Sequence, residues 1–130
     1  AVAGAKLMIV IGHTGCGAVS AAVKLIGSHL TVANATGCQH LDAIVSEIQR
    51  SVGGIPNQPA VKPASPDAGV IADVVARENV LRVVKELRQQ SRTLDNLVCE
   101  RRIAIIGAMY DISTGGIEFL VEDGLGEVRI

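Results

Sequence analysis

Aromatic residues are nearly absent from this sequence of 130 residues, which contains one Tyr, one Phe and no Trp. Apolar residues nevertheless make up 48% of the chain, so a core must be assembled from Val, Ile, Leu and Ala side chains. A chain of this length is expected to bury roughly two thirds of its unfolded surface around one core. The composition therefore predicts a single α/β domain over residues 1–130, with a mainly parallel sheet flanked by helices.

Neither an excess of charge nor a long apolar run is present. The 12 basic and 13 acidic residues give a formal net charge of −1 and are mixed along the chain, which leaves no basic stripe for a nucleic acid backbone. The longest uncharged apolar run, Leu7 to Ile11, is far shorter than the ~20 residues that a membrane span needs. We therefore expect neither a nucleic acid partner nor a transmembrane segment.

Cysteine is also scarce. Cys16, Cys38 and Cys99 cannot all pair with one another, and they do not resemble a secreted disulfide framework. The chain opens with Ala1 and Val2 rather than Met, and it shows no secretory leader or lipidation signal. These features predict a cytoplasmic protein and a first residue that is not a gene start.

The spacing of apolar residues predicts alternating strands and helices. In chain order, the expected elements are a strand at 6–12, helices at 16–26, 39–52 and 67–91, strands at 102–108 and 116–121, and an edge strand at 127–130. Gly27 and then Gly53 and Gly54 are the expected helix stops. All four prolines lie between residues 53 and 66, which predicts an extended connection rather than a domain boundary.

The predicted sheet is thin for the number of helices. With so few strands, we expect apolar faces that only upstream sequence or a partner chain can cover. In the long helix, Asp67 is a suitable N-cap, and the charged side is expected to be solvated. The expected apolar stripe of this helix consists of Val70, Ile71, Val74, Val75, Leu81, Val84 and Leu87.

A histidine and a cysteine lie three residues apart where the first strand ends and the first helix begins. Zinc favours imidazole nitrogen and thiolate sulfur, at ~2.0 and ~2.3 Å, and His13 and Cys16 can approach one ion from the same turn. The start of the helix favours the thiolate of Cys16, and Gly12, Gly15 and Gly17 relieve crowding around the turn. From spacing alone, a polar-loop histidine beside a buried cysteine is the commoner explanation.

A rival metal site uses Cys38 and His40, which together with the first pair would supply four zinc ligands. Alternating positions at the start of a helix usually point apart. We therefore favour a packed Cys38 and a His40 that is capping or exposed. We also expect Cys99 in a loop or at the entry of a strand, and His29 in solvent.

The whole segment IVIGHTGCGAVSAA at residues 9–22 closely resembles the β-class carbonic anhydrase motif, an apolar strand followed by Gly-His-[Ser/Thr]-x-Cys-Gly-Ala. RENVLRVVKEL at 77–87 and IIGAMYDISTGGIEFL from Ile105 resemble later blocks of that family in the family's order. The resemblance covers roughly residues 1–122. It implies a β-carbonic-anhydrase-like α/β fold and a homodimer or larger homo-oligomer, since the family is built from dimers.

The resemblance also implies a zinc cofactor, held in that family by two cysteines and one histidine. His13 and Cys16 match two of these ligands. The other cysteine belongs to an upstream Cys-x-Asp-[Ser]-Arg motif, which this sequence does not contain. The fold is therefore expected to be incomplete at its amino-terminal side. In the family, zinc brings the pKa of bound water towards about 7, the established value for carbonic anhydrase, so that hydroxide converts carbon dioxide to bicarbonate.

With half of the metal site, this chain is expected to bind zinc poorly and to hydrate carbon dioxide slowly or not at all. Two other interpretations stay open, a noncatalytic binding or assembly domain and a truncated remnant of a working enzyme. ATGCQHLDAIVSEIQ at 35–49 resembles, more loosely, carbonic-anhydrase-like domains fused to anion transporters. In some family members the tyrosine that matches Tyr110 helps to bind bicarbonate; here we favour a structural role, with Asp111 accepting from turn amides.

Overall fold

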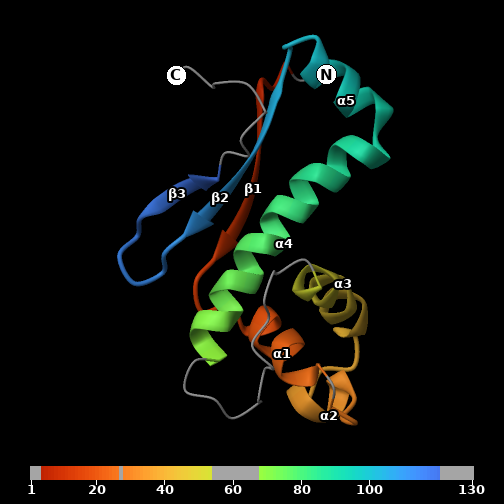
Figure 1. Ribbon diagram of the computed structural model, residues 1–130, viewed down its shortest axis with the longest axis vertical. Helices are drawn as coiled ribbons and strands as arrows, with labels where there is room; N and C mark the ends of the chain where they lie inside the picture. The colour runs from red at the N-terminus through yellow and green to blue at the C-terminus, as the bar shows by residue number, and fades with distance from the viewer. Residues whose placement is uncertain (1–3, 27, 54–67, 121–130) are drawn as a thin grey trace. The chain divides into compact units, whose positions relative to one another are not determined.

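The structure is a computed structural model that describes residues 4–26, 28–53 and 68–120. Figure 1 shows its elements in chain order, which are β1 (Leu7–His13), α1 (Gly17–Leu25), α2 (Val32–Thr36), α3 (Asp42–Val52), α4 (Ala68–Gln90), α5 (Arg92–Cys99), β2 (Ala104–Tyr110) and β3 (Ile117–Leu120). The predicted α/β class, helices beside a small sheet, is confirmed. Two compact units are present. Of the described residues, 4–12 and 80–120 form the sheet unit, and 13–26, 28–53 and 68–79 form the helical unit. A single domain stays a prediction.

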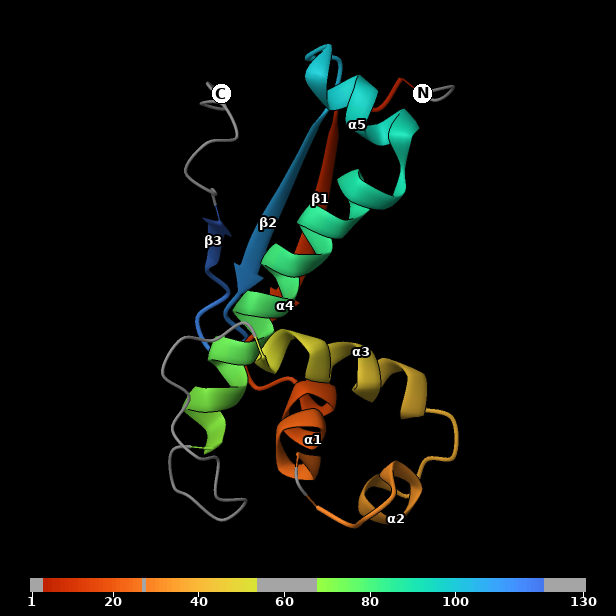
Figure 2. The same cartoon turned by 45° about the vertical axis from the view of Figure 1, so that its right-hand side comes forward.

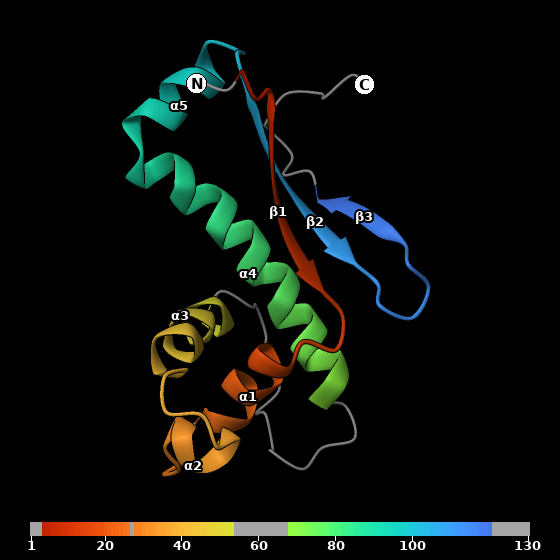
Figure 3. The same ribbon diagram turned by 180° about the vertical axis from the view of Figure 1, so that it is seen from behind.

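The sheet unit contains the strands in the order β1-β2-β3. β1 and β2 run in the same direction (Figures 1 and 3), and the Ala104 amide donates to the Lys6 carbonyl at 2.9 Å. β2 and β3 form an antiparallel hairpin in which Gly107 is opposite Leu120. The described residues thus combine one parallel and one antiparallel pair of strands. The strands predicted at 6–12, 102–108 and 116–121 are found within two residues of their expected starts.

β2 is the buried strand of the sheet unit, with Ile105, Ala108 and Met109 almost inaccessible to solvent. The part of α4 that belongs to this unit packs on it through Val80, which is also buried. A Cβ atom on Gly107 would lie 2.8 Å from Cγ1 of Val80, so glycine is required here by close approach.

β1 contrasts with β2, because its apolar side chains are exposed. Leu7, Met8, Ile9 and Ile11 have exposed fractions of 48, 37, 39 and 57%. Consecutive side chains of a strand point to opposite faces, so β1 is open on both faces. The expectation of a buried strand is therefore wrong for β1, whereas the expectation of uncovered apolar surface is confirmed. Among the described residues β1 also forms an edge of the sheet.

The helical unit packs α1 against α2 and α3 (Figure 2). Its apolar core includes Val19 and Val23 of α1 and Val45 and Ile48 of α3. The helix predicted at 39–52 begins only at Asp42. α2, a helix of five residues, was not predicted from the sequence. Thr31 caps its start by accepting a hydrogen bond from the Asn34 amide.

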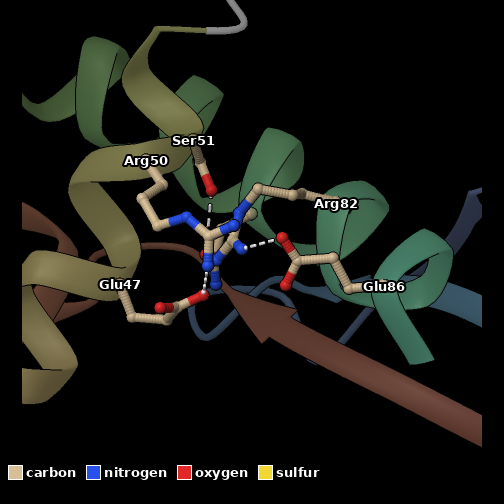
Figure 4. Close-up of polar contacts among 6 residues, drawn as sticks. Glu47, Arg50, Ser51, Arg82 and Glu86 are labelled. Carbon is tan, nitrogen blue, oxygen red and sulfur yellow. Dashed lines mark hydrogen bonds and ion pairs between the residues drawn. The ribbon is translucent and has the colours of Figure 1, made fainter. Parts of the chain in front are cut away.

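α4 confirms the long helix but corrects its buried face. Val70 and Val74 of the expected stripe are 67 and 42% exposed, whereas Ala72 and Ala76 are buried beside Val75. Small side chains allow close packing, so counting only large apolar residues misplaced the stripe. The charged side is not fully solvated either. Arg82 and Glu86, four residues apart, form a 2.7 Å ion pair with exposed fractions of 16 and 20% (Figure 4).

α5 was also missed by the sequence analysis. Ser91 starts it by accepting a hydrogen bond from the Leu94 amide at 3.3 Å, and Leu97 is its buried residue. The guanidinium of Arg88 donates twice to Asp95, at 2.8 and 2.9 Å, which joins the end of α4 to α5. The predicted loop or strand-entry position of Cys99 is therefore wrong, because this residue ends α5.

Several predicted features lie outside the described residues. They are the Gly27 helix stop, the Asp67 cap, the proline-containing stretch after Gly53 and the strand at 127–130. Within the part of the chain that the structure describes, no helix combines the length and the apolar character required to cross a membrane.

Candidate metal centre

The candidate metal centre is the turn that joins β1 to α1. β1 ends at His13, whose side chain is exposed, and Cys16 is the part-buried N-cap residue of α1. The Cys16 carbonyl accepts the hydrogen bond of the Ser20 amide at 2.9 Å, so its backbone begins the helix. Its side chain makes no capping hydrogen bond, which leaves the sulfur available as a ligand.

The imidazole of His13 is oriented by its own turn. Its Nδ1 lies 3.0 Å from the carbonyl oxygen of Thr14. A carbonyl oxygen only accepts hydrogen bonds, so in the neutral ring this contact places the proton on Nδ1. Nε2 then carries the lone pair that can bind a metal, which is the arrangement in which a backbone carbonyl fixes the ligating tautomer.

Gly15, between the two candidate ligands, is held by a residue far along the chain. It has a φ of 64°, in the left-handed region that favours glycine. Its amide donates to Oδ1 of Asp73 on α4 at 2.9 Å, across a sequence separation of 58 residues. Asp73 was not predicted from the sequence as part of this site. One signal could have drawn attention to it, because Asp73 is the only charged residue in the sequence from Ala68 to Ala76.

The rival four-ligand site does not form. Among residues 4–26, 28–53 and 68–120, no group of three or more His, Cys, Asp or Glu side chains is arranged to hold a metal ion. Cys38 is exposed rather than packed, which corrects that prediction, and its amide donates to Thr36 Oγ1 at 3.2 Å. His40 and His29 are exposed, as expected.

The donor chemistry of His13 and Cys16 fits zinc, which takes imidazole nitrogen and thiolate sulfur together. Two donors do not fill a tetrahedron, so the pair fits a part of a zinc site. Cys16 is one of three free cysteines, the others being Cys38 and Cys99.

The turn between β2 and β3 is built around Asp111. Its Oδ1 accepts hydrogen bonds from the Ser113 hydroxyl at 2.6 Å, the Ser113 amide at 2.8 Å and the Thr114 amide at 3.3 Å. These donors, the Ser113 hydroxyl first, lower the pKa of Asp111 from its ordinary value of 3.8. The prediction that Asp111 accepts from turn amides is confirmed. Tyr110 is the last residue of β2 and is opposite Ile117.

The carbonic anhydrase family matches residues 1–117 of the chain. This chain therefore belongs to the carbonic anhydrase family, in its β class. A comparison with curated proteins finds no match.

Solved structures of β-carbonic anhydrases share the fold. The β-carbonic anhydrase CafA of Aspergillus fumigatus has a TM-score of 0.63 at 21% identity, over 94% of this chain and 50% of that one. A tetrameric β-carbonic anhydrase of Sordaria macrospora has a TM-score of 0.62 at 20% identity, over 88% of this chain and 52% of that one. The chain thus spans about half the length of these structures.

Proposed function

We propose that the turn carrying His13 and Cys16 supplies part of a zinc centre for the reversible hydration of carbon dioxide to bicarbonate. The observation that carries the proposal is the orientation of His13, whose Nδ1 contact with the Thr14 carbonyl leaves Nε2 to bind a metal. The family match over residues 1–117 supports the same reaction.

In this proposal each side chain has a defined task. His13 would donate the Nε2 lone pair, and Cys16 would donate its sulfur from the start of α1. Zinc, when bound, is the Lewis acid that makes hydroxide available near neutral pH. The Cys-x-Asp-[Ser]-Arg motif that supplies the family's other cysteine does not occur in this sequence. We therefore propose that this chain alone binds zinc weakly and hydrates carbon dioxide slowly.

We further propose that copies of this chain associate and that the chain works in the cytoplasm. The four exposed apolar residues of β1 would bury surface on association, and the similar protein of Sordaria macrospora is described as tetrameric. Three free cysteines suit a reducing compartment.

The proposal is tested by measuring bound zinc and the rate of carbon dioxide hydration for the wild-type chain, Cys16→Ser, His13→Ala and the control Cys38→Ser. Loss of a residue that hydrogen-bonds to a metal ligand weakens metal binding by up to roughly 100-fold. Cys16→Ser and His13→Ala remove a ligand itself, so we expect each of them to weaken zinc binding by more than this. Cys38→Ser should bind zinc like the wild type, because Cys38 is exposed outside the turn.

Three outcomes would contradict parts of the proposal. If the Cys16→Ser variant still binds zinc like the wild type, Cys16 is not a zinc ligand. Zinc binding that is lost in Cys38→Ser restores the rival site. Full hydration activity of the wild-type chain overturns the expected impairment, whereas zinc binding without any hydration favours a noncatalytic carbonic-anhydrase-like domain.

A further inference from the structure

Only Thr14 and Gly15 lie between the two candidate ligands, so the conformation of these two residues decides how the ligands are presented. Gly15 is in the left-handed region and is exposed. Glycine has the widest choice of backbone conformations, and nothing in its own side chain fixes one of them. The hydrogen bond from its amide to Oδ1 of Asp73, at 2.9 Å, is therefore the contact that opposes this freedom.

The helix that carries Asp73 is connected to the other helices of the helical unit by hydrogen bonds. Gln49 of α3 donates through Nε2 to the Ala22 carbonyl of α1 at 3.1 Å. Ser51 of α3, with only 2% of its surface exposed, donates through Oγ to Oδ1 of Asn79 on α4 at 3.0 Å. α1 begins at the turn, so these contacts run from the turn through α1, α3 and α4 and return to the turn through Asp73.

We propose that Asp73 is a positioning residue, whose carboxylate holds the Thr14–Gly15 peptide so that His13 and Cys16 are presented together to a divalent metal ion. The metal-binding part of this inference rests on the proposed zinc centre, whereas the hold on the turn does not. A carboxylate suits this task because it only accepts hydrogen bonds, and a bond to an ionised acceptor is about twice as strong as a neutral one. Asp73 follows the buried Ala72 in α4, so its backbone is part of a packed helix.

The first measurement needs no metal. Hydrogen exchange of the Gly15 amide is followed by NMR in the metal-free wild-type chain, in Asp73→Ala, in Asp73→Asn and in the control Glu78→Ala. Glu78 also lies on α4 and is partly exposed, so its removal deletes the same charge from the same helix. We expect exchange to accelerate roughly 10- to 100-fold in Asp73→Ala. Asp73→Asn keeps an accepting oxygen, so its Gly15 exchange rate should lie between those of Asp73→Ala and the wild type.

The second measurement is zinc affinity, determined by competition with a chromophoric chelator on the same four proteins. We expect Asp73→Ala to weaken zinc binding roughly 10- to 100-fold, the range for partners that orient metal ligands. Asp73→Asn should recover part of this loss, and Glu78→Ala should match the wild type. A purely structural role would instead lower the melting temperature of the metal-free protein without separating Asp73→Asn from Asp73→Ala in zinc affinity.

The outcomes separate this inference from the proposed function. If the wild-type chain binds no zinc, the proposed metal centre fails, and Gly15 exchange still decides whether Asp73 holds the turn. An unprotected Gly15 amide in the wild-type chain overturns the inference even if Asp73→Ala does not fold. Equal zinc affinities for Asp73→Ala and Glu78→Ala overturn it as well.

Discussion

Two turns of this protein use an aspartate carboxylate to hold a segment that contains a glycine with positive φ. In the hairpin turn, the carboxylate of Asp111 accepts from residues at most three positions away, and Gly115 has a φ of 75°. In the turn between β1 and α1, Gly15 has a φ of 64° and its aspartate is 58 residues away. The hairpin turn is thus complete within its own sequence, whereas the candidate metal centre depends on the packing of three helices.

The difference shows how a turn can be coupled to the rest of a fold. Closing a loop costs conformational entropy that grows with the length of the loop, so the contact between Gly15 and Asp73 costs more entropy than the contacts within the hairpin turn. The hairpin turn should therefore keep its internal hydrogen bonds when distant packing is disturbed. The turn with His13 and Cys16 should lose its hold on Gly15 under the same treatment.

Gly107→Ala, in the strand β2 that leads into the hairpin turn, is the substitution with the largest expected loss of stability. The added Cβ would lie 2.8 Å from Cγ1 of Val80, and overpacking of a core typically costs about 1–3 kcal/mol of unfolding free energy. Urea denaturation measures the loss. Combination with Val80→Ala should relieve part of it, as a coupling free energy in a double-mutant cycle.

The same variant sharpens the comparison through Asp111. Its hydrogen-bond donors lie within three residues, so the folded Gly107→Ala protein should keep the lowered pKa of Asp111. A return of that pKa to its ordinary value, measured by NMR titration, would show that the hairpin turn depends on the packing beneath it.

Gly115→Ala has the next largest expected effect. A Cβ there meets no atom within 4 Å, so the cost comes from the positive φ of 75° alone. For an L-residue this conformation costs about 1–2 kcal/mol, which thermal or urea unfolding can resolve. Gly115→Asn should cost less, because asparagine tolerates the left-handed region. Equal losses in both variants would mean that the side chain meets an obstacle and that backbone conformation is not the cause.

The smallest effect is expected from acidification of the hairpin turn. The pKa of Asp111 is lowered on folding from an ordinary value of 3.8. The ionised carboxylate therefore contributes stability above pH 3.8, and this contribution is lost as the pH falls through the lower folded-state pKa. Asp111→Ala should remove this part of the pH dependence of the unfolding free energy, which acid denaturation below pH 3.8 measures. An unchanged profile would show that the turn does not need its carboxylate.

Local patterns account for what the sequence predicted correctly. The apolar run before His13 and the helical spacing after Cys16 lie within single elements, so β1 and α1 were found almost to the residue. Asp111 was assigned correctly because an aspartate beside a Ser-Thr-Gly-Gly turn finds its partners nearby.

The errors arose where a distant contact decides the structure. The exposure of β1 is set by what covers the two faces of the sheet, and the apolar residues of the strand are the same whether those faces are covered or open. Ala72 and Ala76 replaced Val70 and Val74 in the buried face of α4 because close helix packing favours small side chains. Asp73 could not be paired with Gly15 from periodicity, since their contact joins residues that are 58 positions apart in the sequence.

The open strand β1 has a practical consequence for every measurement on this chain. Proteins commonly blunt a sheet edge with lysine, proline or a bulge, but the stretch from Leu7 to Ile11 carries only aliphatic side chains and Met8. Such an edge is a template on which another strand can align. Any self-pairing there would make melting temperatures rise with protein concentration through mass action, so variants must be compared at one fixed dilution.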